Sequence, residues 1–211
     1  AQHSVHPTGG SLRVFKQFAW LEVGSVKTAF SRPAHQRVTL TVRRFVRIPL
    51  VPGSIEMTIQ IRKAETKDAP AIADMLRSLG LFPHIDAEPS RSTQEHVLQH
   101  LELCSADDSH LVVVAQDMSN EIAGYCAVHW LPYLILTGPE GYVSELFIKE
   151  EYRGQGIGSQ LLEVIKEEAR KRGCVRLMLL NMRKRESYQR QFYSKQGWEE
   201  RPDAANFVLR L

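Results

Sequence analysis

Residues 143–162 read Val-Ser-Glu-Leu-Phe-Ile-Lys-Glu-Glu-Tyr-Arg-Gly-Gln-Gly-Ile-Gly-Ser-Gln-Leu-Leu, a predicted strand that runs into a predicted helix. Three alternating glycines, Gly154, Gly156 and Gly158, mark the junction, where they let the backbone bend tightly and let a ligand approach. The first N–H groups of a helix have no intrahelical partner and lie at the positive end of the helix dipole. A diphosphate fits such a place, so the stretch predicts a phosphate-binding turn.

Two common nucleotide-binding patterns do not fit the residues of this turn. A P-loop ends in Gly-Lys followed by Ser or Thr, and no Lys follows Gly158. The dinucleotide fingerprint needs a third glycine three residues after the second, and Ser159 occupies that position. Arg153 adds a cation at the start of the turn, and the Ser159 hydroxyl adds a donor. A different phosphate ligand is therefore expected, with a tight turn that binds nothing as the competing interpretation.

The composition is typical of a soluble globular protein, with 43% hydrophobic and 24% charged residues in a chain of 211. No apolar run reaches the length of about eighteen residues that a membrane span needs, so no membrane partner is expected. Cys104, Cys126 and Cys174 lie far apart without metal-ligand spacing. This usage favours a reducing compartment, and we expect a cytoplasmic protein without a bound metal.

The first 56 residues differ from the rest of the chain in charge and in pattern. They hold eight Lys or Arg residues and only two acidic ones, and their apolar residues show weak periodicity. Three interpretations stay open for this leader: an organellar transit peptide, upstream translated sequence before a start at Met57, or a structural extension. We expect the folded domain to span residues 57–211. A transit peptide would change the expected location to an organelle.

The net positive charge of the chain comes from this leader, which bears on nucleic-acid binding. Residues 57–211 hold more acidic than basic side chains, whereas a nucleic-acid interface needs a basic surface. A nucleic-acid-binding protein led by residues 1–56 is therefore the weaker hypothesis, and we expect no nucleic-acid partner.

Residues 57–211 alternate between strand and helix patterns. Strands are predicted at 59–62, 111–115, 122–130, 142–148 and 175–180, with the last of these buried, and closing strands at Trp198 and 207–211. Helices are predicted at 68–79, after a capping box at 92–95, at 156–172 and at 187–196. The order is β-α-α-β-β-β-α-β-α-β-β, which combines a hairpin with one βαβ crossover. The predicted fold class is therefore α/β (α+β) with a mixed sheet, not a doubly wound one.

Two motifs in this order resemble the GNAT superfamily of acetyl-CoA-dependent N-acetyltransferases. Arg153, Gly156 and Gly158 match the Arg/Gln-x-x-Gly-x-Gly/Ala pattern that binds the CoA pyrophosphate in that family. Residues 192–198, Phe-Tyr-Ser-Lys-Gln-Gly-Trp, are similar to its Phe-Tyr-x-Lys-x-Gly-Phe block. The resemblance covers residues 57–211. It implies a GNAT-like, mostly antiparallel sheet of six to seven strands with four helices, and an acyltransferase.

The resemblance also implies which residues hold acetyl-CoA as the co-substrate. The backbone of Leu146, Phe147 and Ile148 would pair with the pantetheine arm. The phosphate turn would comprise Arg153, Gly154, Gln155, Gly156, Ile157, Gly158 and Ser159. Many members carry Asn six residues before the Phe of the Phe-Tyr pair, where this chain has Glu186. Asn181 is the substitute that we expect for that hydrogen bond.

Two side chains are candidates for the chemistry of acetyl transfer. Tyr193 matches the tyrosine that commonly serves the family as general acid, with a packed helix tyrosine as the competing interpretation. Glu145 is a carboxylate in a mostly apolar strand, which is unusual unless it faces a cleft. It would take the amine proton or anchor the amine, and a solvent-facing carboxylate is its alternative. Ser144 is a weaker candidate for the same place.

The acceptor is not readable from the sequence, and a small-molecule amine and a protein amine both remain open. Acidic residues in segments that flank the acceptor side of the family favour a cationic acceptor: Asp86, Glu88, Glu199, Glu200 and Asp203. A non-catalytic CoA-binding sensor or regulatory module is the alternative function, and a homodimer stays open. His96, His100 and Cys104 recur every four residues, but without a fourth ligand they favour a helix face over a zinc site.

Overall fold

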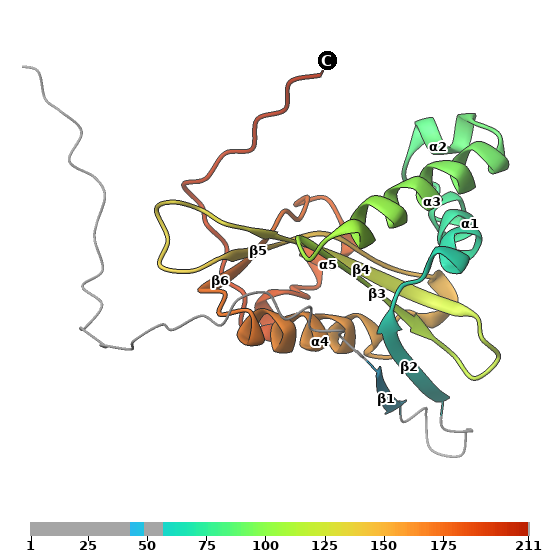
Figure 1. The fold of residues 1–211 in the computed structure, drawn as a ribbon, viewed down its shortest axis with the longest axis horizontal. Coiled ribbons are helices and arrows are strands. Elements are labelled where there is room, and N and C mark those ends of the chain that lie inside the picture. The colour runs from blue at the N-terminus through green and yellow to red at the C-terminus, as the bar shows by residue number, and fades with distance from the viewer. Residues whose placement is uncertain (1–42, 49–56, 211) are drawn as a thin grey trace, which may run out of the picture. The chain divides into compact units, whose positions relative to one another are not determined.

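The computed structural model of the protein describes residues 43–48 and 57–210 and contains one six-stranded sheet (Figure 1). The strands lie in sequence order: β1 (Arg43–Ile48), β2 (Met57–Lys63), β3 (His110–Gln116), β4 (Ile122–Leu131), β5 (Glu140–Ile148) and β6 (Arg176–Leu179). Neighbours pair antiparallel from β1 to β5, and β6 pairs parallel with β5. The predicted mixed, mostly antiparallel sheet is therefore confirmed.

Five α-helices occur in the described part of the chain: α1 (Ala69–Ser78), α2 (Pro83–Ala87), α3 (Ser90–Ala106), α4 (Ile157–Lys171) and α5 (Glu186–Gln189). In Figure 1, α4 lies along one face of the sheet, with α1 and α3 on the other. Side chains alternate along β3, so Val113 packs in the core under α4 and Val112 and Val114 pack in the core under α1 and α3.

The helix predicted at 156–172 is confirmed as α4. Its inner stripe, which includes Ile157, Leu161 and Ile165, is fully buried against the sheet. The helix follows Gly156, which takes the left-handed φ of 79°, and it ends before Gly173, with φ 68°. Both positions suit glycine because other residues are strained in this region.

The start of the second predicted helix is a correction. The capping box at 92–95 does not form, because α3 begins at Ser90, directly after Pro89. The Arg77 guanidinium on α1 donates to the carbonyls of Ile85 (2.7 Å) and Glu88 (2.8 Å), which ties the preceding segment to α1. These tertiary contacts position the start of the helix. The short α2 was not predicted, since it buries no residue and so shows no apolar periodicity.

Other differences from the predicted elements lie after α4. The strand predicted to be buried, β6, is only partly covered because it forms the sheet edge, with Val175 46% exposed beside it. The helix predicted at 187–196 divides into α5 and a 3-10 turn, Ser194–Gln196, because Gln191 takes a φ of 55°. No closing strand forms at Trp198 or within 207–210, where the described chain has no pairing partner and Phe207 is 91% exposed.

One strand lies within the predicted leader. β1 pairs antiparallel with β2, with Val46 opposite Ile59, and so extends the sheet by one strand. Such pairing is what a structural extension would supply, while the domain boundary at Met57 stays a prediction. The rest of the leader lies outside the described residues. Among the described residues, no helix combines the length and apolar character needed to cross a membrane.

Candidate functional site

A groove of about 900 Å³ opens where β5 ends and α4 begins. It brings together ten of the residues expected to bind the co-substrate or to catalyse: Leu146, Phe147, Ile148, Arg153, Gly154, Gly156, Ile157, Gly158, Asn181 and Tyr193. Two predicted residues of the turn do not line it. The Gln155 amide donates to the Glu151 carbonyl (3.1 Å), and Ser159 lies outside the lining.

The turn in the groove has the geometry of an anion cradle. Gly154 and Gly156 have φ values of 76° and 79°, and a Cβ on either would meet nothing within 4 Å. The Gln160 N–H donates to the Gly156 carbonyl (3.1 Å), and the N–H groups before it lie at the open helix end. At Gly158 a Cβ would lie 3.2 Å from Phe192 Cζ, so this glycine also allows close packing.

Basic side chains gather along the same groove. Arg153, Lys184, Arg185 and Arg190 line it, against one acidic lining residue, Glu186. The excess of positive charge suits a ligand with several phosphates, and it adds to the helix dipole of α4. Arg153 was predicted at the turn, whereas the approach of Lys184, Arg185 and Arg190 to it depends on how α5 and its flanking loop fold.

The entrance of the turn is anchored to the β3–β4 hairpin. Tyr152, next to Arg153, is buried and donates from its hydroxyl to Asp117 Oδ2 (2.8 Å). Asp117 Oδ1 accepts the backbone N–H groups of Ser119 (2.9 Å) and Glu121 (2.8 Å). Burial and the hydrogen bond to Asp117 both raise the pKa of Tyr152. The glycine turn is thus held by a contact between distant parts of the chain.

Tyr193 lies in an aromatic cluster at the wall of the groove. Its ring centroid is 4.9 Å from that of Phe192 and 6.0 Å from that of Trp198, both in edge-to-face arrangements. Burial raises the pKa of Tyr193 to about 12, with a smaller contribution from Cys126. The phenol therefore keeps its proton at neutral pH and can donate it.

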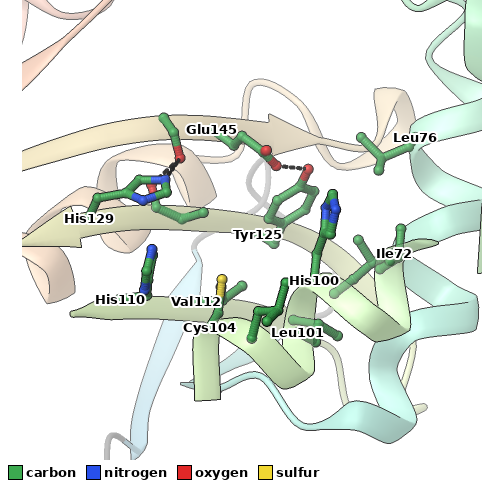
Figure 2. Close-up of a pocket in the computed structure, with 14 residues that line it drawn as sticks. Ile72, Leu76, His100, Leu101, Cys104, His110, Val112, Tyr125, His129 and Glu145 are labelled. Atoms are coloured by element: carbon green, nitrogen blue, oxygen red, sulfur yellow. Dashed lines mark hydrogen bonds between the residues drawn. The ribbon is translucent and has the colours of Figure 1, made fainter. Parts of the chain in front are cut away.

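A second cavity, of about 400 Å³, lies on the sheet face that carries α1 and α3 (Figure 2). Its walls come from these two helices and from β3, β4 and β5: Ile72, Leu76, Val97, His100, Leu101, Leu103, Cys104, His110, Val112, Tyr125, Ala127, His129, Ser144 and Glu145. The predicted catalytic carboxylate, Glu145, and the weaker candidate, Ser144, thus line this cavity and not the groove. The next residue along β5, Leu146, lines the groove.

An irregularity in the β4–β5 pairing explains why two consecutive residues line one cavity. Ala127 lies opposite Glu145, and Val128 lies opposite Val143, so Ser144 is an extra residue on β5. A bulge of this kind interrupts the alternation of side chains between the two faces of a sheet. Ser144 and Glu145 can therefore both point into the cavity.

Two hydrogen bonds order the polar end of this cavity (Figure 2). The buried Tyr125 hydroxyl donates to Glu145 Oε2, and Ser144 Oγ lies 2.9 Å from His129 Nε2. Burial, and then the charge of Glu145, raise the pKa of Tyr125 well above its usual value. Burial and the neighbouring His110, whose ring centroid is 4.6 Å away, lower the pKa of His129. Tyr125 thus stays protonated at neutral pH, and the lowered pKa favours a neutral His129.

Most of these polar partners were not predicted from the sequence. Tyr125, His110 and His129 lie in strands that were predicted from their apolar residues. Their only signal in the sequence is that a polar side chain interrupts the apolar pattern. His100 and Cys104 line the cavity, whereas His96 Nδ1 lies 3.5 Å from Glu88 Oε2. Across residues 43–48 and 57–210, no three His, Cys, Asp or Glu side chains are arranged to hold a metal ion.

The sequence is similar to known acetyltransferases. The sequence model of the acetyltransferase (GNAT) family matches residues 73–198. A thialysine N-epsilon-acetyltransferase of Sus scrofa is 30% identical over 135 residues, which are 61% of this chain and 78% of the relative. The glucosamine 6-phosphate N-acetyltransferase 1 of Oryza sativa subsp. japonica is 28% identical over 112 residues, covering 51% of this chain and 67% of the relative.

The fold is also similar to solved structures. The crystal structure of glucosamine-6-phosphate N-acetyltransferase from Arabidopsis thaliana superposes with a TM-score of 0.58 at 20% sequence identity. The superposition covers 72% of this chain and 99% of that one. At this identity the likeness concerns the fold, and it agrees with the mixed, mostly antiparallel sheet described above.

Proposed function

The chain belongs to the acetyltransferase (GNAT) family and is an acyltransferase, and from this premise we propose that it transfers the acetyl group of acetyl-CoA to a primary amine. The groove at the N-terminus of α4 is the proposed co-substrate site. The observation that carries the proposal is the division of β5 between two sites. Leu146 lines the groove with the glycine turn, while Glu145, one residue earlier, lines the cavity with the polar groups.

The groove fits the parts of CoA. Open N–H groups at the start of α4, the space beside Gly154 and Gly156, and the surrounding cations favour the pyrophosphate. Leu146 to Ile148 pair with β4 on one side and lie beyond the part of β5 that pairs with β6, so their other edge can accept an extended ligand, for which pantetheine is suited. The Asn181 Oδ1 accepts the Ser187 hydroxyl (3.1 Å), which leaves the Asn181 amide free to donate. The co-substrate supplies an activated thioester carbonyl.

The chain's own residues would handle two protons. An alkylamine has a pKa near 10, so it must lose a proton before it attacks. Glu145 would accept that proton, directly or through water, with its carboxylate oriented by the Tyr125 hydroxyl. Tyr193 would donate a proton to the departing thiolate. The C–N bond forms as the C–S bond breaks, and the products are the N-acetyl amine and the free thiol.

A panel of amines with acetyl-CoA, monitored by release of the free thiol, tests the proposal. We expect turnover with at least one primary amine and a rise in melting temperature with CoA alone. A rise with CoA but no thiol release from any amine would favour the non-catalytic CoA-binding module. If neither thiol release nor a rise in melting temperature is observed, both functions are ruled out.

A further inference from the structure

In the described part of the chain, the cavity on the α1 and α3 side of β5 is lined by one carboxylate. Figure 2 draws its fourteen lining residues, and Glu145 is the only acidic residue among them. Neither Lys nor Arg occurs among these residues, in the part of the chain that the structure describes. One oxygen of the carboxylate accepts the Tyr125 hydroxyl, so the other is available to a ligand.

The remaining surface of the cavity is mainly apolar. Ile72 and Leu76 from α1, Leu101 from α3 and Val112 from β3 form its inner walls. Leu103 also lines it while 68% of this side chain is exposed, so the apolar surface continues to the opening. A ligand that enters would therefore contact apolar side chains over most of its length.

One charge beyond the lining, that of Asp107, has the same sign as Glu145. Asp107 follows the end of α3, and its Oδ1 lies 4.0 Å from Nδ1 of the lining residue His110. Burial raises the pKa of the lining thiol, Cys104, and the charges of Glu145 and Asp107 raise it further. The cavity thus lies in a negative local field, which favours an ammonium group and disfavours an anion.

We propose that the acceptor is a primary amine on an aromatic or alkyl body that carries no carboxylate or phosphate. This inference rests on the proposed function and narrows its acceptor. The amine would meet Glu145 near β5, and the body would lie along the apolar walls. A carboxylate or phosphate in this cavity would lose its hydration without gaining a cationic partner, which is costly.

Matched acceptors that differ in one charged group test the proposal. Hexylamine is compared with 6-aminohexanoate and 6-aminohexanamide, and 2-phenylethylamine with 4-(2-aminoethyl)benzoate and its amide. We expect kcat/KM for hexylamine and for 2-phenylethylamine to exceed that for the matching carboxylate at least about tenfold. The reason is that the carboxylate would enter the cavity without a cationic partner. The amides keep the size of the carboxylates, so they should lie closer to the unsubstituted amines.

A gain-of-charge variant provides an independent measurement. Leu103→Arg adds a cation at the exposed rim and should reduce the preference against the carboxylates about tenfold, whereas Leu103→Gln should leave it unchanged. Equal rates for carboxylate and amide, or faster carboxylates, would overturn the inference while the proposed function stands. If none of the amines causes release of the free thiol, both the inference and the proposed function are overturned.

Discussion

The Tyr125 hydroxyl on β4 donates a hydrogen bond to the Glu145 carboxylate on the neighbouring strand β5. The donor is buried and its pKa is raised, while the acceptor is exposed to the cavity. The pair therefore joins a rigid part of the core to the carboxylate that we propose as base. Within residues 43–48 and 57–210, Tyr125 makes no other side-chain hydrogen bond, so its orientation depends on Glu145 and on packing against Phe147 (5.8 Å between ring centroids).

Removing the Tyr125 hydroxyl should affect the use of the amine more than the binding of the co-substrate. We expect Tyr125→Phe to lower kcat/KM for the amine about threefold to tenfold, because the carboxylate loses an orienting donor. KM for acetyl-CoA should change less than about twofold. Tyr188→Phe is the matched control, since it removes the hydrogen bond between Tyr188 and Glu200 (2.8 Å), two residues that line neither the groove nor the cavity. Equal losses in the two variants would contradict the positioning role.

Tyr193→Phe should lower kcat about 100-fold without weakening CoA binding, because only the proton donor is lost. The pKa of Tyr193, about 12, means that its proton is retained through the neutral and mildly alkaline range. Its titration should therefore cause no loss of kcat below about pH 11. Steady-state rates from pH 7 to 10, with CoA affinity by calorimetry, check both statements. A kcat of Tyr193→Phe equal to that of the parent protein at every pH in this range would remove the general-acid role.

Gly156→Ala and Gly173→Ala form a matched pair at the two ends of α4. Both glycines have positive φ and open space beside them, so each substitution should cost about 1–2 kcal/mol in unfolding free energy. Only Gly156 lines the groove. We expect CoA affinity to fall at least about tenfold for Gly156→Ala alone. Similar affinities for the two variants would place the diphosphate elsewhere.

The Tyr152–Asp117 contact should act on co-substrate binding. Tyr152→Phe removes the bond between the hairpin and the entrance of the phosphate turn, so KM for acetyl-CoA should rise about threefold to tenfold with little change in kcat. Ser119→Ala removes another hydrogen bond to Asp117 (2.7 Å) but leaves Tyr152 bound. A rise in KM with Ser119→Ala alone would contradict the anchoring role.

The buried pair of Arg62 and Asp68 should influence stability at acid pH. Burial alone would raise the pKa of Asp68, but hydrogen bonds from Arg62 (2.7 and 2.8 Å) and the Glu65 N–H hold it below its usual value. The folded pKa is thus lower than the unfolded one. The stabilisation is complete above the unfolded pKa and is lost as pH falls through the folded pKa.

Asp68→Asn should therefore lower the free energy of unfolding by about 2–4 kcal/mol at pH 7, and by less as the pH falls. Denaturant unfolding between pH 7 and pH 2.5 measures this. Glu167→Gln breaks the exposed Arg44–Glu167 pair (2.8 Å) and should cost less than about 1 kcal/mol. A pH-independent difference between Asp68→Asn and the parent protein would contradict the assignment.

Local patterns predicted the elements that pack most regularly. The apolar stripe of α4 has the period of a helix, and the residues of the β3–β4 hairpin have the pattern of strands. The alternating glycines mark a tight turn. Neighbouring residues therefore suffice to identify all three. The groove could be predicted for the same reason, since its strand, turn and helix are contiguous. α2 and the interruption at Gln191 could not, because one buries nothing and the other is a single backbone angle.

The sequence by itself determined the family fold, the glycine turn between β5 and α4, and the identity of Glu145 and Tyr193 as candidates. Only the tertiary structure decided that these two line different cavities, that a bulge turns Ser144 and Glu145 toward the same one, and that Tyr125, His110 and His129 accompany them. The physical reason is the range of the interactions. Hydrogen-bonded turns and helix stripes depend on residues a few positions apart, whereas the charge and shape of a cavity depend on side chains that strand pairing brings together from distant segments.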